Sequence, residues 1–359
     1  MTVDPVEAAA DDHGPVGWVE KKEPRWDVVQ ALLTESAAQN QWSNFGPVSG
    51  ALERHIADTL ELSDDQAVIA TSSGTAALEA ISAIEEYRLG RPTRWVVSDF
   101  GFHCTRQGAY RHATVVDCDT DGIIDLERVR EIDHDDYDAV LVTNPFGVLT
   151  DFDSFTAFGH ETGKLVVSDS AGAFDALHGS GQPPQIEALS FHHTKPWGFG
   201  EGGAMIVARS DEAVARSVIN FGLVANMPEI GGASNGKMSD IAAAFILSWV
   251  EHLDDLRDAT TTQYERIAAI ARGRSWRILG DSSADPRVRS CAPLIWRTPV
   301  SLDGTVKEFV TRRYYQPLIG LPMANALFNR IVNVPCHRDM AAVTDEQISA
   351  QLETIERYH

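Results

Sequence analysis

The stretch SFHHTKPWGFGEGG, residues 190–203, holds a single lysine, Lys195, between two apolar runs of the sequence. The run before it, ALSFH (188–192), and the run after it, GAMIVA (203–208), show little polar alternation, which is typical of strands buried on both faces. Lys195 therefore follows directly on the end of a predicted strand. A lone lysine is usually solvated, so the residues at the other strand ends must show whether this one is functional.

Further apolar runs alternate with helix-like segments from residue 67 onward. SGTAALEAISAIEEY (73–87) and DFDSFTAFGHETG (151–163) are typical of helices. The apolar runs are AVIAT (67–71), RWVVS (94–98), TVVDC (114–118), AVLVT (139–143) and KLVVS (164–168). A chain that alternates strand and helix in this way predicts an α/β fold with a mostly parallel sheet.

The sequence predicts three parts. Residues 1–24 are polar and contain proline, which indicates a flexible N-terminal segment. Residues 25–245 carry the strands and form the predicted large domain. From residue 237 a helical pattern continues without proline or glycine to Gly273, and it is expected to lead into a smaller C-terminal domain over residues 246–359.

Composition and charge exclude several classes of protein. The chain has 359 residues, 43% of them hydrophobic, and its net charge of −22 argues against nucleic acid as a partner, because phosphate binding needs clustered Lys and Arg. No run approaches the roughly 20 apolar residues of a membrane span, and the N-terminus lacks a secretory pattern, so a cytoplasmic protein is expected. The four cysteines, Cys104, Cys118, Cys291 and Cys336, form no metal-ligand pair.

Polar residues at three predicted strand ends form a chemically consistent set. TSSGT (71–75) places glycine and hydroxyl groups at the start of a helix, where N–H groups favour an anion. Asp169 and Lys195 follow two later strands, and such ends meet at one edge of an open sheet. Each residue alone has an ordinary structural explanation. Together they provide a phosphate site, an anion for a pyridine nitrogen and an amine for an aldehyde, which are the requirements of pyridoxal 5′-phosphate (PLP).

The order of the motifs resembles the DegT/DnrJ/EryC1/StrS family of PLP-dependent sugar aminotransferases, which have the fold-type I architecture. The resemblance covers residues 44–339 and rests on SNFGP (43–47), SSGTAAL (72–78), SFHHTKPWGFGEGGA (190–204), GASNGKMSDIAAA (232–244) and RRYYQPL with NVPCH (312–318, 333–337). It implies a mixed, mostly parallel seven-stranded sheet in the large domain and a smaller α+β C-terminal domain. It also implies a homodimer with shared active sites.

The resemblance implies a role for each matching residue. Lys195 matches the lysine that forms the Schiff base with PLP, and Asp169 matches the partner of the pyridinium nitrogen. The remaining cofactor-binding positions are Gly74, Thr75 and Ser190 at the phosphate, Phe102 against the ring, and Asn235, which reaches the phosphate of the neighbouring subunit. The implied reaction moves an amino group from an amino acid, expected to be L-glutamate, to a keto-sugar linked to a nucleoside diphosphate.

Some positions depart from the family pattern and leave the acceptor open. Gly172 replaces a common His or Gln, Ile319 replaces a common polar residue, and TNPFG (143–147) replaces a histidine-bearing loop. The alternative is a PLP enzyme of the same fold that acts on an aminocyclitol or small keto compound, or that catalyses another reaction. Candidate binders of a diphosphate or a donor carboxylate are Arg106, Arg312, Arg313 and Arg338.

Two hypotheses from other functional classes are less well supported by the sequence. A non-catalytic protein that keeps the fold would have no need of Lys195 and Asp169, and a nucleotide-dependent dehydrogenase would carry a glycine fingerprint after the first strand, which is absent here. The adjacent His192 and His193 would point to opposite faces of a strand, so no metal site is expected at this pair.

Overall fold

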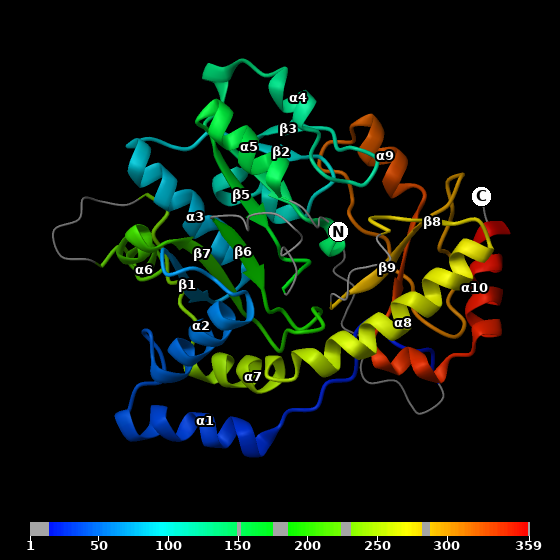
Figure 1. The fold of residues 1–359 in the computed structure, drawn as a ribbon, viewed down its shortest axis with the longest axis horizontal. Coiled ribbons are helices and arrows are strands. Elements are labelled where there is room, and N and C mark those ends of the chain that lie inside the picture. Colours follow the sequence, from blue (N-terminus) through cyan, green and yellow to red (C-terminus); the bar gives the residue numbers. More distant parts are fainter. Residues whose placement is uncertain (1–13, 149–151, 175–185, 224–230, 282–287, 358–359) are drawn as a thin grey trace.

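The computed structural model describes residues 14–148, 152–174, 186–223, 231–281 and 288–357 (Figure 1). A seven-stranded sheet forms the larger part of the molecule, and a three-stranded sheet forms the smaller part. The large sheet is mixed and mostly parallel, as predicted, and the α/β fold class is confirmed.

The large sheet has the strand order β1-β7-β6-β5-β4-β2-β3. Its strands are β1 (Gln66–Thr71), β2 (Trp95–Ser98), β3 (Thr114–Val116), β4 (Ala139–Thr143), β5 (Leu165–Asp169), β6 (Glu187–Ser190) and β7 (Gly203–Ala208). Strand β7 runs antiparallel to both of its neighbours, β1 and β6, while the other pairs are parallel. Every strand but β7 therefore ends at the same edge of the sheet. Thr71, Ser98, Thr143, Asp169 and Ser190 lie along that edge.

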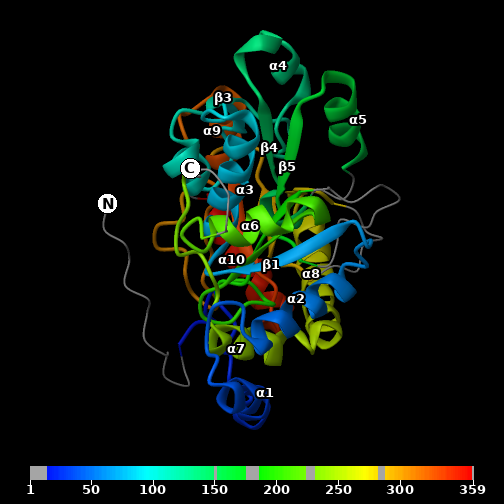
Figure 2. The same ribbon diagram turned by 90° about the vertical axis from the view of Figure 1, so that its left-hand side faces the viewer.

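Helices cover both faces of this sheet, which is why its strands are apolar throughout. The helices are α1 (Trp26–Gln39), α2 (Pro47–Thr59), α3 (Gly74–Leu89), α4 (Leu126–Arg130), α5 (Asp153–Thr162), α6 (Glu212–Val218) and α7 (Asp240–Val250). Val68 and Ala70 of β1 pack in one core cluster, whereas Ala67 and Ile69 pack in a second cluster with α3. Figure 2 shows α1 and α7 at one end of the molecule and α4 and α5 at the other.

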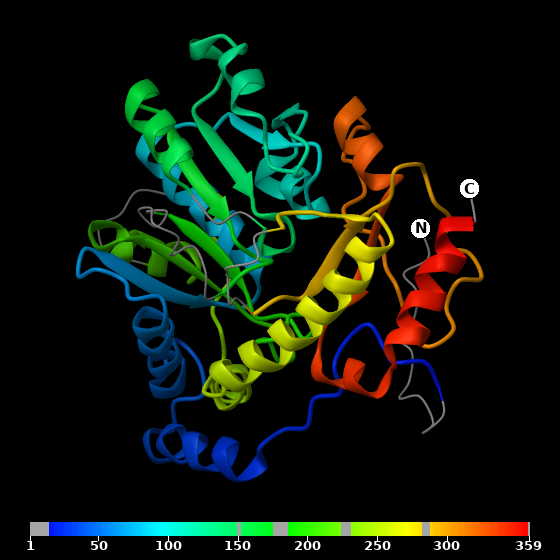
Figure 3. The same ribbon diagram turned by 45° about the vertical axis from the view of Figure 1, so that its right-hand side comes forward.

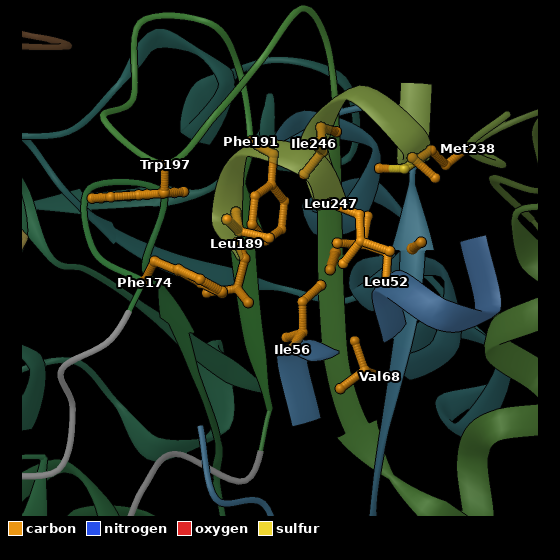
Figure 4. Packing of buried hydrophobic residues seen from close by; sticks show 14 of the residues in the cluster. Leu52, Ile56, Val68, Phe174, Leu189, Phe191, Trp197, Met238, Ile246 and Leu247 are labelled. Carbon is orange, nitrogen blue, oxygen red and sulfur yellow. The ribbon is translucent and has the colours of Figure 1, made fainter. Parts of the chain in front are cut away.

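The first of these clusters supports the loop that carries Lys195. Phe191 and Trp197 lie at either end of the loop segment and are both fully buried. Phe174 packs against both rings, at centroid distances of 5.1 and 6.1 Å, and Leu189 of β6 belongs to the same cluster (Figure 4). The position of Lys195 is thus fixed by aromatic residues on both sides of it.

The smaller part consists of an antiparallel sheet with the order β10-β9-β8 and two long helices (Figure 3). Its elements are α8 (Leu253–Gly273), β8 (Arg277–Ile278), β9 (Cys291–Ile295), α9 (Pro322–Phe328), β10 (Ile331–Pro335) and α10 (Asp345–Arg357). Ile267 of α8 and Leu352 of α10 are completely buried in one core cluster with the strands. This is the arrangement of a small α+β unit.

The long helical pattern predicted to run to Gly273 is divided into two helices. Helix α7 ends at Val250 and α8 begins at Leu253, although neither proline nor glycine marks the break. Leu253 and Leu256 still pack in the core beneath the large sheet, whereas Ile267 packs beneath the small one. Helix α8 therefore connects the two cores, and the predicted boundary between residues 245 and 246 falls inside α7.

Residues 14–24, which we call the N-terminal strap, cross from the small sheet region to the Lys195 loop. The sequence predicted a flexible segment over residues 1–24, of which residues 1–13 lie outside the described residues. Val16 forms a bridge with Phe309, and its N–H donates to Glu308 O at 2.8 Å. The backbone N–H of Lys21 donates to Asp339 Oδ2 at 3.1 Å. Residues 14–24 are thus tied to the fold by contacts that local composition does not encode.

Two buried carboxylates join the sheet regions. Asp99 accepts N–H bonds from Ile319 at 2.6 Å, from Gly320 and from Leu321 at 2.5 Å. Asp117 accepts from the first turn of α9, as an N-terminal cap does. Within the described residues, none of the helices is long and apolar enough to traverse a bilayer.

Candidate active site

A cavity of about 430 Å³ lies at the edge where the parallel strands end. Residues from the large sheet, the small sheet region and the N-terminal strap surround it. Those that bear on the chemistry are Ser73, Gly74, Thr75, Phe102, Thr143, Asp169, Gly172, Ser190 and Lys195, with Trp18, Cys291, Tyr314 and Tyr315 opposite. The prediction that functional groups gather at this edge matches the geometry.

The turn between β1 and α3 forms one wall of the cavity. The Ser73 side chain caps α3 by accepting the N–H of Ala76 at 3.1 Å. A Cβ on Gly74 would stand 3.0 Å from Ser190 Cβ, so the turn packs closely against β6. The first N–H groups of a helix have no partners within it, and the helix dipole adds positive potential there. This wall is therefore suited to a phosphate group.

Gly203, the last residue of the GEGG motif, packs against the same turn. A Cβ on Gly203 would stand 2.3 Å from Ser73 C and 2.4 Å from Gly74 N, so only glycine fits at this position in β7. Gly203 also pairs in register with Ser190 of β6. Gly203 thus allows close packing of backbone on backbone.

Asp169 ends β5 and lies at the base of the cavity with only 2% of its surface exposed. Its Oδ1 accepts the N–H of Ala171 at 3.2 Å, and the Thr143 hydroxyl donates to the carboxylate. Burial raises the pKa of Asp169, while these hydrogen bonds and the charge of Lys195 oppose the rise. A cationic N–H placed above this carboxylate would stabilise its anionic form.

Lys195 lines the same cavity, within electrostatic range of Asp169. Burial lowers the pKa of its amine, and Asp169 opposes that shift. A lysine with a lowered pKa is more often neutral and is therefore a better nucleophile and base. Its loop is held by two indole groups, because Trp197 Nε1 donates to Ser190 O at 2.8 Å and Trp249 Nε1 donates to Pro196 O at 2.7 Å.

The remaining predicted residues divide into two groups. Thr75, Ser190 and Phe102 line the cavity; Phe102 is 49% exposed, and its ring lies edge-on to Tyr315 at 6.4 Å. Asn235 does not line the cavity of this chain. It is exposed, and its Oδ1 accepts a hydrogen bond from Lys237 Nζ at 2.7 Å. The structure therefore brings together all the predicted site residues except Asn235.

The departure at Gly172 has a steric explanation. A Cβ on Gly172 would stand 3.0 Å from Asn144 O and 3.1 Å from the N atoms of Phe146 and Gly147. The TNPFG loop thus occupies the space that a larger residue at position 172 would need. The two departures from the family pattern, at Gly172 and in the TNPFG loop, therefore depend on each other sterically. Ile319 is 52% exposed and lies outside the cavity lining.

Several lining residues were not predicted. Tyr314 and Tyr315 belong to the quoted RRYYQPL motif, and Tyr315 packs on Phe146 at 4.9 Å, so the motif itself was the available signal. Trp18 comes from the N-terminal strap and contacts the Tyr314 ring at 5.9 Å. No pattern in the sequence of the strap indicates this contact.

Charged groups other than Lys195 and Asp169 are few at the cavity. Among the lining residues that the structure describes there is no arginine, so none of the four candidate arginines reaches it. Arg338 instead pairs with Glu20. His192 Nδ1 lies 2.8 Å from Thr194 Oγ1, and its Nε2 lies 3.4 Å from Glu201. The described residues contain no cluster of His, Cys, Asp and Glu that would hold a metal ion.

The donor set fits PLP. The first turn of α3 with Thr75 and Ser190 can bind a phosphate, the Asp169 carboxylate can face a pyridine nitrogen, and the Lys195 amine can bind an aldehyde. The sequence model of the DegT/DnrJ/EryC1/StrS aminotransferase family matches residues 27–290. The chain belongs to this family. Membership confirms the family resemblance predicted from the sequence, and the family is described as one of aminotransferases.

Curated relatives are similar over part of their length. Protein Rv3402c of Mycobacterium tuberculosis is 31% identical over 237 residues, which cover 62% of this chain and 57% of the relative. A dTDP-4-amino-4,6-dideoxy-D-glucose transaminase of Shigella dysenteriae is 29% identical over 230 residues, which cover 60% of this chain and 59% of the relative. The chain thus matches less than two thirds of the length of these proteins.

Solved structures are similar over almost the whole chain. A DegT DnrJ EryC1 StrS aminotransferase from Brucella abortus has a TM-score of 0.75 and 21% identity, and the match covers 92% of this chain and 95% of that one. At this level of identity the similarity concerns the fold.

Proposed function

We propose that this protein is a PLP-dependent aminotransferase that moves the amino group of L-glutamate to a keto-sugar carried on a nucleoside diphosphate. The observation that carries the proposal is the placement of the Lys195 amine and the buried Asp169 carboxylate in one cavity, beside the N-terminus of α3. Amine, carboxylate and anion site are the three groups that this chemistry requires.

Each residue of the site has a proposed task. The turn at Gly74 and Thr75 and the Ser190 hydroxyl bind the phosphate, and the exposed face of Phe102 covers the ring. Asp169 keeps the ring nitrogen protonated, which its burial makes effective because competing water is excluded. When bound, PLP supplies an electron sink for the electron pair at the donor Cα.

Lys195 has two tasks in this proposal. Its amine holds the cofactor aldehyde covalently in the resting enzyme. After the donor replaces it, the free Lys195 amine would take the proton from the donor Cα and deliver it to the cofactor C4′, on the other side of the transferred nitrogen. The burial that lowers the pKa of Lys195 favours the neutral form needed for the first of these proton transfers.

The exposed position of Asn235 supports a homodimer. Its side chain lies on the surface of this chain, at the segment whose Gly236 O accepts the N–H of Ser72 beside the phosphate turn. We propose that Asn235 reaches the phosphate of the adjacent subunit, as in the family. Size-exclusion chromatography with light scattering tests the dimer, and an Asn235→Ala variant that binds PLP as tightly as the wild type would contradict the role of this residue.

The identity of the acceptor is supported by the relative from Shigella dysenteriae, whose name describes a dTDP-linked amino sugar transaminase. An acceptor without a nucleotide is the second candidate, and it is favoured by the coupled departures at Gly172 and TNPFG and by the lack of arginine in the described lining.

A two-stage assay separates the candidates. The enzyme is first loaded with glutamate, and the release of 2-oxoglutarate is measured. A panel of nucleotide-linked keto-sugars, keto-cyclitols and small keto acids is then added, and the aminated product is identified by mass spectrometry. We expect ping-pong kinetics and amination of a nucleotide-linked sugar. Failure to release 2-oxoglutarate in the first stage would contradict transamination from glutamate.

A further inference from the structure

Lys22 of the N-terminal strap donates to the backbone of the loop that carries Lys195. Its Nζ lies 2.9 Å from His193 O, 2.5 Å from Lys195 O and 2.5 Å from Gly198 O. An ammonium group has three N–H donors, so these three carbonyls use its full capacity. A neutral amine would have only two.

A second side chain completes this support. The indole Nε1 of Trp249 in α7 donates to Pro196 O at 2.7 Å, and the Lys22 ammonium lies over the Trp249 ring, 5.5 Å from its centroid. Two residues far apart in sequence therefore hold four carbonyls within residues 193–198. The Lys195 backbone is thus held at its own carbonyl and at those of its neighbours.

The strap that carries Lys22 is itself anchored outside the loop. Glu20 is 5% exposed and pairs with Arg338, and the N–H of Lys21 donates to Asp339. Lys22 therefore approaches the loop from a fixed segment that is bonded to the small sheet region. Lys22 Nζ donates to the Lys195 carbonyl, which also accepts the N–H of Gly198, so the strap is joined to the loop at Lys22.

We propose that Lys22 is a positioning residue that holds the Lys195 loop so that the Lys195 amine faces the cofactor cavity. The inference rests on the proposed function, in which that amine binds the PLP aldehyde. Lys22 lies outside the residues that line the cavity, so it acts through the Lys195 backbone and contacts no substrate. Its effect should appear in the covalent capture of PLP and not in phosphate binding.

The test compares Lys22→Met with Lys21→Met. Methionine is an unbranched apolar side chain that donates no hydrogen bond. Lys21 is the adjacent lysine, and its side chain is 81% exposed, so its replacement is the matched control. For each apoprotein, samples taken at intervals after PLP is added are reduced with borohydride, which gives the rate at which PLP attaches to Lys195. The affinity for pyridoxamine phosphate, which binds without the covalent bond, is measured separately.

We expect Lys22→Met to slow capture of PLP by about 10-fold or more while the affinity for pyridoxamine phosphate changes by less than about 3-fold, because a misplaced nucleophile loses rate steeply. Lys21→Met should match the wild type in both assays. Capture at the wild-type rate in Lys22→Met, or an equal loss in both assays, would overturn the proposal. Should Lys22→Met not fold, Lys22→Gln is used instead: its shorter amide cannot donate to all three carbonyls, and it must show the same selective loss of capture.

The wild-type measurement distinguishes the two levels of inference. If wild-type protein does not capture PLP at all, the proposed function fails and Lys22 has nothing to position. If wild-type protein captures PLP normally and Lys22→Met does so equally well, the proposed function stands and the role of Lys22 is refuted.

Discussion

Gly203→Ala is expected to damage the phosphate site by displacing the turn at Ser73 and Gly74, although Gly203 itself does not line the cavity. The new Cβ would stand 2.3 Å from Ser73 C, 2.4 Å from Gly74 N and 2.5 Å from Ser73 O, where ordinary contacts begin near 3.4 Å. The strand cannot easily yield, because Gly203 pairs in register with Thr71 and Ser190 on its two sides. The turn at Ser73 must therefore move by about 1 Å.

The magnitude follows from this displacement. Overpacking of a close contact costs about 1–3 kcal/mol of stability. A shift of about 1 Å in a binding group reduces binding or rate by roughly 100-fold when the geometry is critical. We therefore expect the dissociation constant for PLP to rise by about 10- to 100-fold, and the apoprotein to lose about 2 kcal/mol of unfolding free energy.

The assay is a titration of apoprotein with PLP, followed by its visible absorbance, with urea unfolding of the same preparations. Gly273→Ala is the control, since a Cβ there meets no atom within 4 Å and the residue ends α8. It should leave PLP binding unchanged and stabilise the helix by about 0.5–1 kcal/mol. A folded Gly203→Ala protein with wild-type affinity for PLP would refute the packing argument.

Three further substitutions test other parts of the account. Asp169→Ala should keep part of the cofactor affinity but lose most of the turnover, because the ring nitrogen loses its anionic partner; near-normal steady-state rates would show that another group protonates the ring. Burial raises the pKa of Glu187 from 4.5 to about 7, so between these values the folded state holds a proton that the unfolded state has lost, and stability falls as pH rises. Glu187→Gln should remove that penalty, and its stabilising effect in urea titrations should grow by about 2 kcal/mol from pH 5.5 to pH 8.5; a constant effect at both pH values would contradict the assignment. Asp99→Ala leaves the N–H groups of residues 319–321 without their acceptor and should cost about 2–4 kcal/mol of unfolding free energy, and a loss below about 1 kcal/mol would show that water replaces the carboxylate.

The strand ends could be predicted because local sequence determines them. Apolar runs and the turn residues after them located the strands along the chain. Parallel strands end at the same edge of a sheet, which brings Asp169 and Lys195 together there. The SSGT turn was recognisable for the same reason, since a small-residue helix start has a local signature. These predictions depend on periodicity and capping, which a single sequence contains.

The contacts between distant segments could not be predicted. The N-terminal strap looks polar and unstructured in sequence, and only the folded chain shows that Trp18 reaches the cavity and Lys22 reaches the Lys195 carbonyl. The coupling of Gly172 to the TNPFG loop is also tertiary, because it depends on distances of about 3 Å between separate loops. The break between α7 and α8 has no local signal, and the change from one core to the other, which occurs within α8 between Leu256 and Ile267, has none either.

The most direct test of the account is the site of covalent PLP attachment. Purified protein is incubated with PLP, reduced with borohydride, digested and analysed by mass spectrometry. We expect a visible absorption band that the reductant bleaches and a pyridoxyl group on the peptide that contains Lys195, both absent in Lys195→Ala protein that remains folded. A pyridoxyl group on a different lysine, or a protein that stays colourless with PLP, would contradict it.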